Sequence, residues 1–569
     1  MNRTNKIIYL LSNREKYLVC LILILSILNM ILDVFSIGIL IPLFANLTDQ
    51  IKFDNEFFNL ILSFLEYEIF KQTSSVVSII ILIFLFKNLI ILLLKWFENE
   101  LTYGFLRKNS KNLLNFYINK NYLFHLNNNS SELIKNIQGE CNIVSFNILR
   151  PFLSIISLLI SVITILILLI GINAKITIVT ILFFSIIGII FSSFTKKILK
   201  KLGKDRNKYS GLLLKSLQQT FSSIREIIIS NKKVFFLNHF DNSNAKVLQS
   251  GIKSNFIYSI PRSIIEISLV LLIGAIIIYL DTSKILFTEI ILTLTTFLVG
   301  ASRLMPGISN IFSNISVLIY NLNSLNIFSE DFFNFLKTNK KDQNKKQISF
   351  KKLQFKNANF RYPGRTKKII SNLNLDLKFN DKIGIIGDTG SGKSTLINIL
   401  TGLLKLNKGE ILIDGLKIKS FNRDWYNIIS YVPQNILTLD ENLKDNITLG
   451  EKKINSNYLN KIYKILNLNE VKKRYSNSST IGERGSKISG GQNQRIGLAR
   501  AFYKKSKILI LDEALNSIDV RLRDKILDSI FEIYKDKLVI LVSHQIDALK
   551  KFNIILKVED GKIVRIRKK

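Results

Sequence analysis

The chain has 569 residues, 48% of them hydrophobic, and a formal net charge of +37. Its length implies more than one domain, and its positive mean hydropathy indicates membrane-spanning segments. Two cysteines and three histidines without metal-ligand spacing argue against a disulfide framework and a metal enzyme. The excess of Lys and Arg fits either nucleic-acid binding or the cytoplasmic loops of a membrane protein.

Six apolar runs occur in the first 305 residues, each near the 20 residues that a helix needs to cross a bilayer. Buried helices of a large soluble core are an alternative for one or two of these runs, but not for six. We therefore expect a membrane domain over residues 1–335. Its spans are predicted at about 18–44, 76–94, 152–170, 176–195, 260–280 and 285–304.

The charges of the loops predict the orientation of this domain. Residues 196–253 contain 13 Lys and Arg against 3 Asp and Glu, whereas residues 48–72 contain 2 Lys against 5 Asp and Glu. Basic loops remain in the cytoplasm, so both termini are expected there, in a multi-pass protein of the inner (plasma) membrane. This topology accounts for most of the basic charge, and we expect no nucleic-acid partner.

The lengths of the loops also differ between the two sides. The external connections 171–175 and 281–284 are short, whereas the internal stretches are long and polar, which predicts helices that continue into the cytosol. Aromatic residues at 122–125 and 234–237 would then lie at cytoplasmic tips, where they either dock on another domain or pack locally. The apolar segment 57–65 is too short to span and is expected to lie along the outer membrane surface.

A Lys-, Asn- and Gln-rich stretch predicts a linker at 336–347, followed by a second domain at 348–569. Within it, Gly387–Thr395 follows an apolar run typical of a buried strand and precedes a helical pattern. A glycine-rich turn in this context binds phosphate, because backbone N–H groups and the helix N-terminus surround the anion. Lys393 is expected to reach the β- and γ-phosphates of ATP, and Ser394 to hold Mg²⁺.

Four polar side chains that follow apolar runs complete an expected hydrolytic site. Asp512 would contact Mg²⁺, mostly through water, and Glu513 would polarise the attacking water as a general base. Gln434 is placed to sense Mg²⁺ and the γ-phosphate, and His544 to hold the γ-phosphate. A lone histidine after a strand is usually structural, so the role of His544 depends on the other three residues.

The segment Ser489–Gln492 opens a helical pattern and offers a hydroxyl and backbone N–H groups to an anion. With it, residues 348–569 resemble the α/β P-loop nucleotide-binding domain of an ABC transporter, and residues 1–335 the all-α, six-helix membrane half of an ABC exporter. The resemblance implies that Ser489–Gly491 binds the γ-phosphate held by the opposite subunit, and that Tyr362 stacks on adenine. The ATP-binding residues are then Tyr362, Gly387, Asp388, Thr389, Gly390, Ser391, Gly392, Lys393, Ser394, Thr395, Ser489, Gly490, Gly491 and Gln492. The catalytic residues are Gln434, Glu513 and His544, and the Mg²⁺ ligands Ser394, Gln434 and Asp512.

This chain departs from the family pattern at a few positions. Ile488 replaces the usual Leu, Leu515-Asn516 replaces a usual Thr-Ser, and Gln545 stands where Arg often follows the histidine. None of these changes removes a group expected at phosphate or water. With one membrane half and one ATPase per chain, we expect a homodimer with two identical sites. A heterodimer with another half-transporter is the alternative.

Three basic residues within the predicted spans indicate an anionic cargo, because intramembrane charges are costly unless functional. Lys87, Arg262 and Arg303 fall in the inner half of the bilayer, at a depth of roughly 20–27 Å for a rise of about 1.5 Å per residue. A cavity lined by them would attract a phosphate or pyrophosphate head group, and Glu266 would pair with Arg262. Snorkelling of the three side chains to the inner interface is the alternative.

The strings Ile260–Arg262 and Arg303–Pro306, with the external segment 57–65, resemble lipid-linked oligosaccharide flippases of the PglK type, a branch of the exporters. This resemblance implies ATP-driven movement of a polyprenyl-pyrophosphate-linked glycan from the inner to the outer leaflet. An exporter of another lipid, a peptide or a drug is the alternative. A soluble ABC ATPase does not explain the six spans, and an importer normally has separate membrane subunits.

Overall fold

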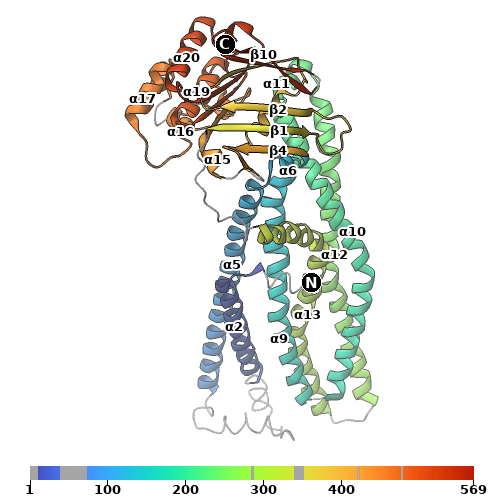
Figure 1. The fold of residues 1–569 in the computed structure, drawn as a ribbon. Coiled ribbons are helices and arrows are strands. Elements are labelled where there is room, and N and C mark those ends of the chain that lie inside the picture. Colours follow the sequence, from blue (N-terminus) through green and yellow to red (C-terminus); the bar gives the residue numbers. More distant parts are fainter. Residues whose placement is uncertain are drawn as a thin grey trace. The chain divides into compact units, whose positions relative to one another are not determined.

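The chain separates into two compact units in the computed structural model (Figure 1). The first consists of Met1–Lys120 and Phe124–Lys341, and the second of Asn121–Leu123 and Asp342–Lys569. The external segment 57–65, and the predicted linker from residue 339 on, lie outside the described residues. The structure describes residues 10–38, 73–172, 174–282, 287–338, 351–418, 421, 423–475, 479–559 and 561–568.

The first unit is helical. Four of its helices contain 46 to 52 residues, and at about 1.5 Å per residue each is more than twice as long as the roughly 30 Å hydrocarbon core of a bilayer. They therefore continue well beyond a membrane, as the sequence predicted. The long helices are α2 (Asn13–Gly38), α5 (Thr73–Ile118), α9 (Arg150–Ile172), α10 (Ala174–Ser222), α12 (Lys233–Thr282) and α13 (Phe287–Thr338), and the short ones are α7 (Ser130–Ile134), α8 (Cys141–Val144) and α11 (Ile224–Ser230). The short helix α6 (Tyr122–Asn127) begins with two residues of the second unit and continues in the first.

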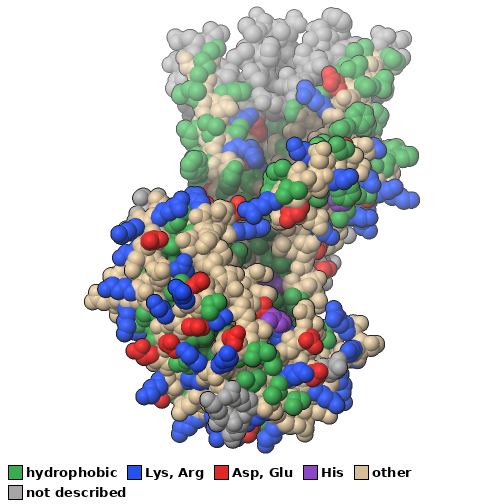
Figure 2. Space-filling model, turned by 90° about the horizontal axis from the view of Figure 1, so that it is seen from above, with side chains coloured by type: hydrophobic (Ala, Val, Ile, Leu, Met, Phe, Trp, Pro, Cys, Tyr) green, Lys and Arg blue, Asp and Glu red, His purple; other side chains and the backbone are tan. Residues whose placement is uncertain are grey.

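Five stretches among the described residues are long and apolar enough to cross a membrane: Asn13–Asp33, Val77–Ile118, Ser130–Ile170, Ala174–Ser222 and Lys233–Ala275. Each overlaps one of the first five predicted spans. The sixth predicted span begins outside the described residues, and its backbone is helical from Phe287, where α13 begins. Many large hydrophobic side chains of these stretches are exposed, among them Leu92, Ile189 and Val270, a pattern that suits contact with lipid. Figure 2 shows hydrophobic side chains on the surface of the molecule.

Close approach of α10 and α13 stabilises the first unit. A Cβ atom on Gly203 of α10 would lie 1.9 Å from the carbonyl oxygen of Tyr320 on α13, so only glycine fits there. One turn away, Arg206 donates from Nη1 to Asn321 Oδ1 at 2.5 Å and from Nη2 to Ser324 Oγ at 2.7 Å. Glycine lets the two helix backbones approach closely at this crossing, and the arginine adds two hydrogen bonds to α13 beside it.

The helix that leads into α9 is interrupted by two π-helical turns, η2 (Lys135–Glu140) and η3 (Ser145–Leu149). The first of them carries a buried polar network. Lys135 Nζ donates to Asn207 Oδ1 at 3.1 Å, and Asn207 Nδ2 donates to Glu140 Oε1 at 2.7 Å. These bonds tie the π-helical turn to α10.

The second unit contains two sheets. A four-stranded antiparallel sheet has the order β2-β1-β4-β5, and a six-stranded sheet has the order β10-β9-β3-β8-β7-β6. In the larger sheet β3 pairs in parallel with β8 and β9, and β7 pairs in parallel with β6 and β8. The strands are β1 (Lys352–Phe360), β2 (Ile370–Lys378), β3 (Lys382–Ile386), β4 (Lys408–Ile413), β5 (Leu416–Lys417), β6 (Ile429–Val432), β7 (Ile508–Asp512), β8 (Leu538–Val542), β9 (Ile554–Glu559) and β10 (Lys562–Lys568).

Every residue of β7 and β8 is buried, which explains why these strands read as continuous apolar runs in the sequence. The carboxyl ends of β6, β7 and β8 lie at one edge of the larger sheet, because neighbouring parallel strands run in the same direction. The helices are α14 (Lys393–Leu400), α15 (Arg423–Ile428), α16 (Leu443–Thr448), α17 (Ser456–Ile465), α18 (Asn469–Arg474), α19 (Gly490–Lys504) and α20 (Val520–Ile533), with 3₁₀ turns η4 (Glu483–Gly485) and η5 (Ile546–Leu549).

Candidate functional site

The glycine-rich turn joins β3 to α14, as the sequence predicted. Gly387, Gly390 and Gly392 have φ values of 152°, 83° and 110°, which side chains rarely allow. A Cβ atom on Gly387 would also lie 2.4 Å from the carbonyl oxygen of Val558. The turn therefore requires glycine, and its shape brings the backbone of residues 387–392 around the first turn of α14.

Two polar side chains of this turn fit a bound anion. Lys393 is buried, and its ammonium donates to the carbonyl oxygens of Gly387 at 2.7 Å and Asp388 at 2.9 Å. The hydroxyl oxygen of Ser391 is buried and has no hydrogen-bond partner among the described residues. A cation and an unsatisfied hydroxyl beside a helix N-terminus match the phosphates of a nucleotide.

Asp512 ends β7 in a buried position, and Tyr431 of the neighbouring strand β6 donates its hydroxyl to Asp512 Oδ2 at 3.1 Å. Burial raises the pKa of Asp512 above its ordinary value, and the negative charge of Glu513 adds to this effect. The bond from Tyr431 and the positive charge of Lys393 lower the pKa and oppose the rise. A cation beside Asp512 would favour the charged carboxylate.

Glu513 lies at the centre of the polar contacts at this sheet edge. Gln434 donates from Nε2 to Glu513 Oε2 at 2.8 Å, and His544 Nε2 lies 3.1 Å from Glu513 Oε1. Asn516 Nδ2 also donates to Glu513 Oε2, at 3.2 Å. Glu513 has a left-handed backbone with a φ of 51°, and its N–H donates to the carbonyl oxygen of Val542 at 3.1 Å. The fold therefore brings together Gln434, Glu513 and His544, which the sequence predicted to act together.

Ser489 caps α19 through a reciprocal pair of bonds. Its hydroxyl accepts from Gln492 N at 3.2 Å, and its own N–H donates to Gln492 Oε1 at 2.9 Å. No hydrogen bond among the described residues joins Ser489–Gln492 to the turn at Gly387–Thr395 of the same chain. In the described part of the chain, these two predicted ATP-binding elements are thus not joined by hydrogen bonds.

Tyr362 lies beside the first turn of α14. Its hydroxyl is 3.4 Å from Thr395 Oγ1, and its ring meets Phe360 edge to face at a centroid distance of 5.0 Å. This neighbour supports the ring from one side, a suitable arrangement for stacking on a planar base.

The three basic residues of the predicted spans have different surroundings. Lys87 is buried and forms an ion pair with Asp33 of α2. Its charge is therefore already neutralised, and it is a weaker candidate for binding an anionic head group than the sequence predicted. Arg262 is exposed on α12, and no ion pair among the described residues joins it to Glu266, contrary to the prediction. Arg303 belongs to α13, and its side chain lies outside the described residues.

Three residues in these contacts had no assigned role in the sequence interpretation. Tyr431 was detectable in principle, because it lies on an apolar strand that ends near Gln434. Asn516 follows Glu513 by three residues, a spacing that permits a contact across a tight turn. Asp33 and Lys87 lie on separate helices, and no local pattern in the sequence indicates that they pair.

Comparison with known families identifies the two units. The profile of the ABC transporter family matches residues 370–516, and the profile of the ABC transporter transmembrane region matches residues 19–302. These matches together cover more than half of the chain, which therefore belongs to the ABC transporter family. It has the fused membrane and ATP-binding domains of an exporter half-transporter, and the predicted fold class is confirmed.

Solved structures and curated relatives agree with this classification. A bacterial Atm1-family ABC exporter with ATP bound matches with a TM-score of 0.75 and 16% identity, over 97% of this chain and 94% of that chain, which shows the fold. A Rickettsia typhi protein, named as a presumed export ATP-binding/permease protein, is 30% identical over 65% of this chain. The matched region spans 65% of that relative's length. An ATP-dependent lipid A-core flippase of Wigglesworthia glossinidia brevipalpis is 34% identical over 36% of each chain.

Proposed function

We propose that two copies of this chain form an ATP-driven exporter in the inner membrane, with the termini in the cytoplasm. Its substrate is an anionic amphipathic lipid, most specifically a polyprenyl-pyrophosphate-linked oligosaccharide that it flips to the outer leaflet. The observation that carries the proposal is the arrangement of Gln434 and His544 on the two oxygens of Glu513. This arrangement lies beside the buried carboxylate Asp512.

The side chains of the site suit ATP hydrolysis. Lys393 and the backbone of Gly387–Gly392 would bind the β- and γ-phosphates, and Tyr362 would support adenine. Glu513 would accept a proton from the attacking water, while His544 and Gln434 fix its carboxylate and face the γ-phosphate. Mg²⁺ would be held by Ser394, Gln434 and Asp512, a set of oxygen ligands that this ion prefers, and would neutralise phosphate charge.

A second copy of the chain would complete each site. Ser489–Gly491 makes no hydrogen bond to the phosphate-binding turn of its own chain among the described residues, yet it offers a capped helix N-terminus to an anion. We propose that it contacts the γ-phosphate held by the partner. Because Glu513, His544 and Gln434 are all present, two identical chains would give two complete sites.

The identity of the cargo depends on the membrane unit. An exposed arginine within an apolar helix, Arg262 on α12, is costly unless it faces water or an anion, so it supports an anionic head group. The lipid A-core flippase among the relatives supports a lipid. A relative named for transport of subtilin, in Bacillus subtilis, is 27% identical and makes a peptide exporter the second candidate.

The ATPase part is tested with purified protein in lipid nanodiscs. Glu513→Gln is expected to lower ATP turnover by at least about a hundredfold while ATP binding persists, because only the proton acceptor is lost. Unchanged turnover would exclude Glu513 as the base. A nucleotide-trapped dimer in this variant, seen by mass photometry, would support the two-site arrangement.

The cargo is tested by reconstitution in liposomes, with movement across the bilayer scored in parallel for three fluorescent probes. These are a polyprenyl-pyrophosphate glycolipid, a lipid A analogue and a cationic peptide. We expect ATP-dependent movement of the pyrophosphate lipid and its loss in Arg262→Ala, whereas the neighbouring exposed Ser263→Ala is the control. Movement of lipid A or peptide alone would replace the proposed cargo with that probe.

A further inference from the structure

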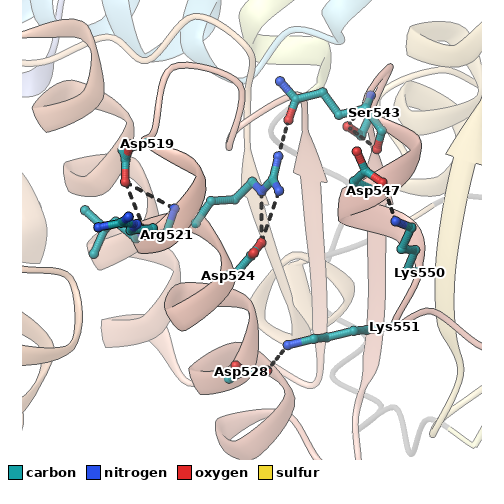
Figure 3. Close-up of polar contacts among 11 residues, drawn as sticks. Asp519, Arg521, Asp524, Asp528, Ser543, Asp547, Lys550 and Lys551 are labelled. Atoms are coloured by element: carbon teal, nitrogen blue, oxygen red, sulfur yellow. Dashed lines mark hydrogen bonds and ion pairs between the residues drawn. The ribbon is translucent and has the colours of Figure 1, made fainter.

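Arg523 is buried on α20, although Arg521 and Asp524 on the same helix are exposed. Its guanidinium donates from Nη1 to Gln545 Oε1 at 2.5 Å. Its Nε and Nη2 donate to Asp524 Oδ1 at 3.2 and 3.1 Å, and Figure 3 draws the polar contacts around Asp519, Asp524 and Ser543. A buried guanidinium needs such partners: Asp524 offsets its charge, and Gln545 accepts a hydrogen bond that would otherwise be unmade.

Gln545 directly follows His544, and the backbone on both sides of the histidine is held. On one side, the N–H of buried Ser543 donates to the carbonyl oxygen of Ile385 in β3 at 3.2 Å. On the other side, the N–H of Gln545 donates to Ser543 Oγ at 3.0 Å, and its side chain accepts from Arg523. His544 therefore extends toward Glu513 between one anchor on the sheet and one on α20.

The start of α20 is itself fixed. Asp519 caps the helix by accepting from the N–H groups of Arg521 and Leu522 at 3.1 and 3.4 Å. The N–H of Arg523 donates to the carbonyl oxygen of Asp519 at 2.7 Å. Apolar residues of α20 and η5, among them Ile526 and Leu549, lie in one buried cluster. The backbone of Arg523 is thus held in place, so its side chain can fix the position of the Gln545 side chain.

We propose that Arg523 is a positioning residue for ATP hydrolysis, which acts through Gln545 to hold His544 against Glu513. The inference rests on the proposed ATPase function. The same contact favours an uncharged acceptor at residue 545: a guanidinium there would face the buried guanidinium of Arg523, and like charges repel.

The test measures ATP hydrolysis by the full-length protein in nanodiscs. Arg523→Met and Gln545→Ala are each expected to lower kcat by about tenfold or more, because a small misplacement of a reacting group has effects of this size. The KM for ATP should stay within about twofold, because the phosphate-binding turn is untouched. The double variant should lose no more than either single one, since both remove the same link. Arg521→Met, an exposed arginine on the same helix, is the matched control.

Moving the arginine from residue 523 to residue 545 distinguishes a positioning role from a general packing role. Gln545→Arg alone is expected to lower kcat, because it places two guanidinium groups against each other. Combining it with Arg523→Glu should restore most of the activity, because the link is rebuilt with the donor and acceptor exchanged. If Arg523→Met does not yield folded protein, Gln545→Ala, at an exposed residue, tests the same link.

The outcomes separate the two proposals. Absence of ATP hydrolysis in the wild-type protein would overturn the proposed function. If the wild type hydrolyses ATP and Gln545→Ala has the same kcat as the control Arg521→Met, the positioning role of Arg523 is wrong. The proposed ATPase function would then still stand. Additive losses in the double variant, or no recovery when Gln545→Arg is combined with Arg523→Glu, would also overturn the positioning role.

Discussion

His544 and Glu513 meet at the ends of two adjacent parallel strands, with His544 Nε2 3.1 Å from Glu513 Oε1. Gln434, which follows the next strand of the same sheet, binds the other carboxylate oxygen at 2.8 Å. Three consecutive strands of the sheet thus present three side chains to one another. Such preorganisation is the main way in which a protein stabilises charge that develops during a reaction.

The His544 contact predicts a loss of turnover without a loss of binding. His544→Ala is expected to lower kcat for ATP hydrolysis on the order of a hundredfold, because Glu513 loses its partner and the proposed contact of His544 with the γ-phosphate is removed. Binding of a fluorescent ATP analogue should change little, since Lys393 and its turn remain. Turnover equal to that of wild type would show that the contact is structural.

The ion pair between Lys87 and Asp33 predicts that removing Asp33 alone destabilises the membrane unit more than removing both charges. Asp33→Asn is expected to destabilise the membrane unit by about 3–5 kcal/mol, because it leaves Lys87 buried without a counter-ion. The double variant Asp33→Asn with Lys87→Met should recover most of this loss. Thermal unfolding midpoints of the purified variants in nanodiscs give the comparison.

The same double variant decides the role of Lys87 in transport. If Lys87 only neutralises Asp33, the recovered double variant should move the pyrophosphate glycolipid at the wild-type rate. A folded double variant without such movement would instead restore Lys87 as a residue that contacts the head group.

The close approach of α10 and α13 predicts that alanine lowers stability at Gly203 but not at Gly211 of the same helix. Gly203→Ala is expected to lower stability by about 1–3 kcal/mol, because its Cβ atom meets the carbonyl oxygen of Tyr320. Gly211→Ala on the same helix meets only ordinary contacts, at 3.8 Å, and should raise stability by about 0.5–1 kcal/mol. Equal thermal midpoints for the two variants would contradict the close packing.

The raised pKa of Asp512 predicts that the variant Asp512→Asn is more stable than the wild type, by an amount that depends on pH. Folding favours the protonated carboxyl, so the charged form destabilises the fold at pH values above the folded-state pKa, and this penalty disappears below the unfolded-state pKa. Without Mg²⁺ and nucleotide, Asp512→Asn should therefore unfold at a higher temperature than wild type at neutral pH, and the difference should shrink on acidification.

The control for this prediction is Asp440→Asn, the same substitution at an exposed residue of the same unit. If Asp512 is a Mg²⁺ ligand as proposed, Asp512→Asn should also lose Mg²⁺-dependent turnover, because an amide is a weaker ligand for this ion than a carboxylate. A gain that persists unchanged at acidic pH would mean that packing, rather than charge, is responsible.

Much of the molecule could be predicted from local sequence. The apolar runs predicted the first five candidate spans because a bilayer demands about 20 apolar residues in succession. The turn at Gly387–Thr395 was predicted in its correct place between a strand and a helix, because its glycines encode the backbone conformation directly. The carboxylates Asp512 and Glu513 were found because they end a fully apolar strand.

The sequence by itself determined the membrane unit, the phosphate-binding turn and the strand ends that carry Gln434, Glu513 and His544, since periodicity and glycine act over a few residues. Only the tertiary structure decided which side chains pair. Lys87 binds Asp33, Tyr431 binds Asp512 and Arg523 binds Gln545. The two partners of each pair belong to different segments of the fold, and their contacts depend on helix packing and strand order, which no local pattern encodes.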